Sequence, residues 1–143
     1  MRFLLDTNVV SEWVKPQPDP NVATWLAEVD EDSVFLSVAS FAEIRQGIEM
    51  MPAGQRRVRL MDWLTDELPA RFEGRVLGID QRIAELWGIA MARGQKAGAP
   101  PGAMDVFFAA TAEAYGLTLV TRNVRDFSPA MIPLLNPWTQ SLE

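Results

Sequence analysis

The chain of 143 residues contains neither histidine nor cysteine. Without cysteine it can form no disulfide framework, zinc ribbon or thiol nucleophile. Without histidine it lacks the commonest general base and the commonest zinc ligand, which excludes Ser-His-Asp hydrolases and two-histidine ribonucleases. Any acid–base or metal chemistry must therefore come from carboxylates, amides, hydroxyls, Lys or Arg.

Long apolar runs and excess positive charge are also missing. No stretch approaches the ~18 consecutive apolar residues of a membrane span. The apolar N-terminal run meets an acid at Asp6, so it does not have the form of a signal peptide. We therefore expect a cytoplasmic protein with no membrane partner. The net charge of −6 argues against a simple electrostatic nucleic-acid binder, but not against an enzyme that holds an anionic substrate through metal ions.

Size and composition favour one compact domain. Apolar residues make up 48% of the chain and charged residues 22%, a balance typical of a globular core. The proline-rich stretches at residues 16–20 and 100–101 are short enough to be loops. We find no internal repeat, and we predict a single domain over residues 1–143.

Short apolar runs alternate with amphipathic segments along the chain. The apolar runs predict strands, and the amphipathic segments predict helices. Strands are expected at residues 2–5, 34–36, 76–77, 117–121 and 132–135, and helices at 7–14, 21–29, 38–51, 54–68, 81–97 and 103–115, the last of them ended by Gly116. This alternation predicts a three-layer α/β/α domain with a central parallel sheet of four to five strands.

Acidic and amide side chains follow the predicted strands at several places. In parallel sheets, functional residues gather beyond the carboxyl ends of the strands. The side chains that this topology would bring to one edge are Asp6, Glu43, Asp105, Asn123 and Asp126. Carboxylates held close together repel one another unless a cation lies between them. All-oxygen ligands favour Mg²⁺ or Mn²⁺, whose bound water can attack phosphorus, so the pattern points to metal-assisted phosphoryl hydrolysis.

Four segments in order resemble the motifs of PIN-domain proteins. They are MRFLLDTNVVSE, in which a strand ends in Asp-Thr-Asn, LSVASFAEI around Glu43, DVFFAATA beginning at Asp105, and LVTRNVRDF. Each motif alone is weak evidence for the family, but four motifs in the same order are specific evidence. Together they span residues 2–135. The chain resembles most of all the toxins of the VapC and FitB types.

This resemblance implies catalytic metal ligands at Asp6, Glu43 and Asp105, with Mg²⁺ or Mn²⁺ as the cofactor. The family's fourth acid often lies at the position of Asn123, whose amide can bind a metal through its oxygen but brings no charge. Asp126 could supply the missing carboxylate, or could cap the following turn. As the fourth metal ligand, Asn123 is favoured by its position in the motif, whereas Asp126 is favoured because it carries a carboxylate.

Several of these residues also have structural interpretations. Asp6 could cap the first helix, and Glu43 could form a capping box with Ser40, although we expect that helix to begin near Ser37. The macrodipole of the following helix favours an acid in its first turn, at Asp105.

Thr7, Asn8 and Thr121 could orient the metal ligands, or could serve as helix caps. Glu12 is expected to be solvated or salt-bridged. The arginines at positions 56, 57 and 59 are expected to form a solvated helix face rather than an RNA contact.

The resemblance implies an endoribonuclease that acts as the toxin of a toxin–antitoxin pair, with RNA as substrate, a cognate antitoxin as partner, and a homodimeric assembly. One alternative is a PIN-like binding or regulatory module, which Asn123 favours. Another is a haloacid-dehalogenase-type phosphatase, but that class expects an acid where Asn8 stands, and the only lysines are Lys15 and Lys96.

Overall fold

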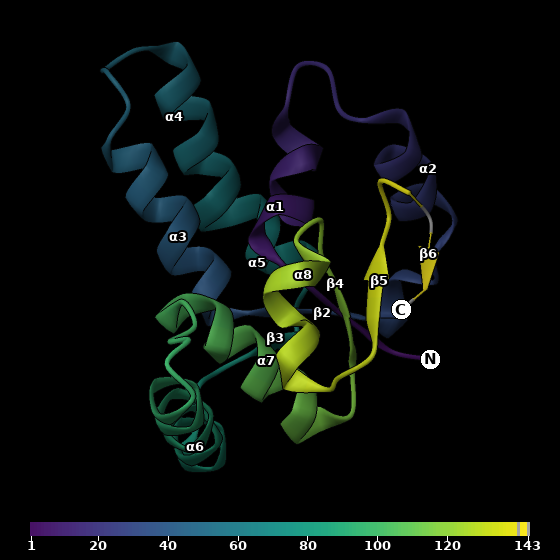
Figure 1. Cartoon of the computed structure of the whole chain (residues 1–143). Coiled ribbons are helices and arrows are strands. Elements are labelled where there is room, and N and C mark those ends of the chain that lie inside the picture. The colour runs from purple at the N-terminus through teal and green to yellow at the C-terminus, as the bar shows by residue number, and fades with distance from the viewer. Residues whose placement is uncertain (140, 143) are drawn as a thin grey trace.

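The computed structural model describes residues 1–139, 141 and 142. The strands form one sheet in the order β3-β2-β1-β4-β5-β6 (Figure 1). Strands β1 to β5 are parallel, which confirms the predicted parallel sheet, whereas β6 pairs antiparallel with β5 and was not predicted. The strands are β1 (Phe3–Leu5), β2 (Val34–Ser37), β3 (Val76–Leu77), β4 (Thr118–Val120), β5 (Leu134–Asn136) and β6 (Ser141–Leu142).

The helices follow the predicted positions closely. They are α1 (Thr7–Val10), α2 (Pro20–Glu28), α3 (Val38–Glu49), α4 (Gln55–Asp62), α5 (Leu68–Arg71), α6 (Gln81–Lys96), α7 (Ala103–Tyr115) and α8 (Val124–Phe127), with 3₁₀ turns η1 (Ser11–Val14), η2 (Glu31–Ser33) and η4 (Ser128–Ala130). The short helix α8 was not predicted. Gly116 ends α7 with a φ of 65°, in the left-handed region that favours glycine, as predicted. Within the described residues, no helix has the length and hydropathy to span a bilayer.

Two apolar clusters lie on opposite faces of the sheet. Successive side chains of a strand point to opposite faces, so Leu5 packs with Val10 of α1 in one cluster, while Leu4 packs with Phe108 of α7 in the other. Helix α6 lies against α7. The sheet therefore has helices on both faces, as predicted for a three-layer domain.

The chain reverses its direction of travel across the sheet at β1. It runs from β1 outward through β2 to β3, and then returns to place β4 on the other side of β1. The N–H of Asp6 donates to the carbonyl of Val120 at 2.9 Å, so the carboxyl ends of β1 and β4 lie side by side. Such a reversal leaves a crevice between the neighbouring strand ends, which is where ligands bind in open α/β sheets.

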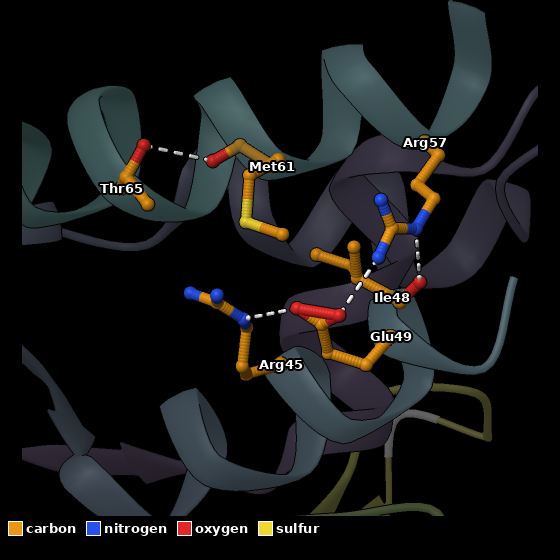
Figure 2. Close-up of polar contacts among 6 residues, drawn as sticks. All are labelled: Arg45, Ile48, Glu49, Arg57, Met61 and Thr65. Carbon is orange, nitrogen blue, oxygen red and sulfur yellow. Dashed lines mark hydrogen bonds and ion pairs between the residues drawn. The ribbon is translucent and has the colours of Figure 1, made fainter. Parts of the chain in front are cut away.

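Arg57 joins α4 to the C-terminal end of α3 (Figure 2). Its Nε donates to the carbonyl of Ile48 at 3.1 Å, and its Nη2 donates to Oε2 of Glu49 at 2.7 Å. Glu49 also pairs with Arg45 at 3.1 Å. A cation at a helix C-terminus satisfies carbonyls that have no partner within the helix. Arg57 is therefore a structural residue of this hairpin.

The helix predicted over residues 54–68 is interrupted by a π-helical turn, η3 (Trp63–Glu67). The N–H of Leu68 bonds to the carbonyl of Trp63, five residues back. Pro69 explains the widened turn, because proline has no N–H and its ring would clash with the carbonyl four residues earlier. The Thr65 hydroxyl donates to the carbonyl of Met61 at 2.9 Å (Figure 2), a contact that threonine side chains commonly make one turn back along a helix.

Glu12 is buried, with 2% of its surface exposed. Its Oε1 accepts the N–H of Asp19 at 2.9 Å, and its Oε2 forms an ion pair with Lys15, although no hydrogen bond of regular geometry reaches that oxygen. The expectation of a solvated side chain was wrong and the salt-bridged alternative is confirmed. The physical reason is that the proline-rich loop needs an internal acceptor for the N–H that begins α2.

Candidate functional site

Asp6 follows β1 directly and is 6% exposed. One carboxylate oxygen accepts the N–H of Thr7 at 2.7 Å. The other accepts the Thr121 hydroxyl at 2.7 Å and the Asn8 amide at 3.3 Å. Asp6 is the N-cap of α1, as the structural interpretation expected. Capping occupies only part of its carboxylate, because a carboxylate has about four acceptor positions.

Thr121 ties the end of β4 to Asp6. Its hydroxyl oxygen accepts the backbone N–H of Asn123 at 3.0 Å, and its hydroxyl hydrogen goes to Asp6. Asn8 accepts the N–H of Arg122 at 3.5 Å. Both residues therefore connect Asp6 to the turn after β4. Asn123 contributes to this network through its backbone, while its side chain is exposed.

Glu43 lies one turn inside α3 and is half-buried. Its Oε1 accepts the Thr7 hydroxyl at 2.6 Å, and the same hydroxyl lies 3.0 Å from the Ser40 hydroxyl. Ser37, not Ser40, caps α3, through its hydroxyl and the N–H of Ala39. The capping-box interpretation of Glu43 and Ser40 was therefore wrong. From the sequence, Ser40 has only the pattern of a possible helix cap, because nothing near it in the chain indicates its contact with Thr7.

Asp105 lies in the first turn of α7, where the helix macrodipole favours a negative charge. A Cβ at Gly102 would lie 3.2 Å from its Oδ2, so glycine leaves room for the carboxylate. Among residues 1–139, no hydrogen bond to this carboxylate is made. Both oxygens of Asp105 are therefore available to a ligand, whereas hydrogen bonds occupy part of the Asp6 carboxylate.

The three carboxylates act on one another electrostatically. The pKa of Asp6 is raised from 3.8 to about 6, chiefly by burial; the hydrogen bonds from Thr121 and Thr7 oppose this rise, and the charges of Asp105 and Glu43 add to it. Burial also raises the pKa of Asp105, with contributions from the charges of Asp126 and Glu43. The structure thus brings Asp6, Glu43 and Asp105 into one electrostatic neighbourhood.

Asp126, unlike Asn123, carries a charge that can act on this group. Its negative charge contributes to the raised pKa of Asp105. Asp105 and Asp126 both line a groove of about 350 Å³ that also borders α6 and α7. Asn123 does not line this groove. Neither Asp6 nor Glu43 lines it, so among the candidate ligands this groove links Asp126 to Asp105 alone.

The donor set suits a hard divalent cation. It consists of carboxylate oxygens without imidazole or thiolate, the ligands that Mg²⁺ and Mn²⁺ prefer. As the side chains stand, no three acidic groups among the described residues are close enough to bind one ion together. Asp6 and Asp105 are nevertheless partly buried and are repelled by neighbouring carboxylates, and a bound cation would relieve this repulsion. The Asp105 carboxylate, which accepts no hydrogen bond among residues 1–139, is available to such a cation.

The family model for the PIN domain matches residues 3–129. The chain belongs to the PIN-domain family. This PIN domain is 36% identical over 136 residues to the VapC ribonuclease Y4jK of Sinorhizobium fredii, which covers 95% of this chain and 97% of the relative. It is 34% identical over 136 residues to the toxin FitB of Neisseria gonorrhoeae, covering 95% and 98%.

The crystal structure of FitAcB from Neisseria gonorrhoeae shares the fold of this PIN domain, with a TM-score of 0.87 at 34% identity, covering 95% of this chain and 98% of that one. A DNA-bound VapBC from Salmonella typhimurium matches with a TM-score of 0.76 at 25% identity, covering 96% and 98%. The resemblance to PIN-domain toxins, inferred from four short motifs, is thereby confirmed.

Proposed function

We propose that this PIN domain is a metal-dependent endoribonuclease and the toxin of a toxin–antitoxin pair. The observation that carries the proposal is the convergence of Asp6, Glu43 and Asp105 at the reversal point of the sheet, with raised pKa values at Asp6 and Asp105. Relatives that match over nearly their whole length are named ribonuclease and toxin, which supports both halves of the proposal. Membership of the PIN family leaves the phosphatase alternative without support.

The proposed ligands of Mg²⁺ or Mn²⁺ are Asp6, Glu43 and Asp105, with Asp126 rather than Asn123 as the fourth acid. A bound ion would lower the pKa of a water and stabilise the charge that develops on the phosphate. The polar residues around the proposed ligands contribute by orienting their carboxylates. The Thr121 hydroxyl and the Asn8 amide hold Asp6, and the Thr7 hydroxyl holds Glu43.

The proposed partner is a cognate antitoxin, since the matched structures are FitAB and VapBC assemblies. An acidic cleft attracts a basic side chain, and that attraction weakens as salt is added. We further propose that the whole chain is one domain, that it forms a homodimer, and that it acts in the cytoplasm.

The test is to incubate antitoxin-free protein with total tRNA and a structured RNA, with Mn²⁺ or Mg²⁺ and with or without EDTA. Asp6→Asn and Asp105→Asn should each lower the rate at least about 100-fold, because each removes a charged metal ligand. Asp80→Asn is the matched control, since Asp80 is an exposed cap of α6 whose carboxylate accepts the N–H of Ile83, and its loss should leave cleavage unchanged.

Cleavage that needs metal and disappears in both variants supports the proposal. Cleavage that persists in EDTA or in either variant contradicts it. Folded protein that binds Mn²⁺ but cuts no RNA would favour the binding-module alternative.

A further inference from the structure

We propose that Ser40 is a positioning residue of the metal site: its buried hydroxyl fixes the Thr7 hydroxyl, which in turn holds the Glu43 carboxylate. This inference rests on the proposed function, because it assigns a role toward the same metal. Ser40 lies within the second motif, but its sequence pattern indicated only a possible helix cap.

The direction of the hydrogen bonds follows from counting hydrogens. The Thr7 hydroxyl has one hydrogen, and it lies 2.6 Å from Oε1 of Glu43. An ionised carboxylate can only accept, so that hydrogen belongs to Glu43. The Thr7 oxygen lies 3.0 Å from the Ser40 oxygen and has no second hydrogen to give. Ser40 must therefore be the donor, and the bonds run in one direction from Ser40 to Thr7 to Glu43.

This direction matters because Thr7 serves two carboxylates at once. Its backbone N–H donates to Asp6 at 2.7 Å, and its hydroxyl donates to Glu43. A threonine hydroxyl can rotate among staggered positions. The bond from Ser40, which is fully buried, selects the rotamer that points to Oε1 of Glu43. Among the described residues, the other Glu43 oxygen accepts no hydrogen bond and so is available to a ligand.

A parallel arrangement acts on Asp6. The backbone N–H of Asn123 donates to the Thr121 hydroxyl, and that hydroxyl donates to Asp6. Each carboxylate is thus held by a threonine hydroxyl, and each hydroxyl is held by a further donor. For Asp6 that donor is a backbone N–H, which only a proline at position 123 would remove, whereas for Glu43 it is the Ser40 side chain, which an alanine substitution removes.

Ser37 offers a matched comparison. It lies three residues before Ser40 next to the same helix, and both side chains are fully buried. The Ser37 hydroxyl accepts the N–H of Ala39 and so stabilises α3 alone. Ser37→Ala and Ser40→Ala each remove one buried hydroxyl, but only Ser40→Ala reaches Glu43.

The experiment is calorimetric titration of the full chain with Mn²⁺ alone, for wild type, Ser37→Ala, Ser40→Ala, Thr7→Val and the Ser40→Ala/Thr7→Val double variant. Both serine variants should lower the unfolding temperature by a similar amount, about 3 °C. Only Ser40→Ala should weaken Mn²⁺ binding, by about tenfold, the range seen for groups that orient metal ligands. Because Ser40 acts through Thr7, adding Ser40→Ala to Thr7→Val should change the affinity by less than about twofold.

Three results would overturn the role of Ser40 alone: unchanged Mn²⁺ affinity in Ser40→Ala, equal weakening in Ser37→Ala, or an undiminished effect of Ser40→Ala in the Thr7→Val background. Wild-type protein that binds no Mn²⁺ would instead overturn the metal site of the proposed function, and the role of Ser40 with it.

Discussion

In the metal-free protein, replacing Asp6 with Asn should raise the free energy of unfolding at neutral pH, although it removes a side chain at the centre of the site. Asp6 is buried with other acids nearby, and its pKa rises from 3.8 to about 6. Above that pH the folded protein must hold a charge that the unfolded chain would expose to water. The Asn variant does not carry this charge.

The magnitude follows from the pKa difference. Between pH 3.8 and about 6 the folded state binds more protons at Asp6 than the unfolded state does, so stability falls as the pH rises through this window. The full loss, present above about pH 6, is about 3 kcal/mol. Asn would lose part of the hydrogen bonding to Thr121 and Asn8, which costs about 1–2 kcal/mol. We therefore expect a net gain of about 1–2 kcal/mol at neutral pH.

The assay is urea unfolding in EDTA from about pH 4 to about pH 7, with the free energy extrapolated to water. Wild type should lose stability across this range, and Asp6→Asn should show a flatter profile that crosses above wild type near the upper end. Asp80→Asn removes a carboxylate from an exposed cap and should follow the wild-type profile within about 0.5 kcal/mol. Mn²⁺ at neutral pH should stabilise wild type and leave Asp6→Asn nearly unchanged.

Parallel profiles for wild type and Asp6→Asn would refute the reasoning, because the pH dependence would then come from other groups. So would an Asp6→Asn variant that is less stable than Asp80→Asn near neutral pH. That result would mean that the hydrogen bonds to Asp6 outweigh the cost of burying its charge.

Further predictions concern residues outside the three proposed ligands. Glu12→Ala should destabilise the protein by about 3 kcal/mol in urea unfolding, because Asp19 loses the acceptor for its N–H and a buried space is left; a loss under about 1 kcal/mol would show that water replaces the carboxylate. Gly116→Ala should lower stability by about 1 kcal/mol in thermal unfolding, since its φ is 65°, and unchanged stability would contradict the left-handed cap. Asn123→Ala should keep RNA cleavage within about threefold of wild type, whereas Asp126→Ala should slow it about tenfold or more; the reverse ranking would make the Asn123 amide the fourth ligand.

The positions of the proposed ligands in the fold were predictable wherever a local rule and the sheet topology indicated the same edge of the sheet. Asp6 could be assigned because an apolar strand ends in an acid, and Asp105 because an acid begins an amphipathic helix. The topology of parallel sheets then brings such ends to one edge. The alternation of strands and helices predicted the three layers for the same reason, since it depends on burial periodicity alone.

Other features depend on contacts between distant residues and left no local signal. Ser40 follows a strand as a cap would, and only the approach of Thr7, 33 residues earlier, separates its position from that of Ser37. Glu12 looks like an exposed helix residue until the proline-rich loop folds back on it. The π turn was in principle readable, because Pro69 cannot continue a regular helix, but the apolar periodicity on either side concealed it.

The pairing of β1 with β4 also limits when the proposed site can form while the chain is being synthesised. The bond between Thr121 and Asp6 spans 115 positions of sequence, and β1 has its place in the middle of the sheet only once β4 has been made. Contacts at such separations form late, since a long loop must close first. Before Thr118 is translated, Asp6 therefore has no neighbouring strand on one side. A chain that stops short of Thr118 would still carry the proposed ligands Asp6, Glu43 and Asp105, but it would lack Thr121, whose hydroxyl holds Asp6.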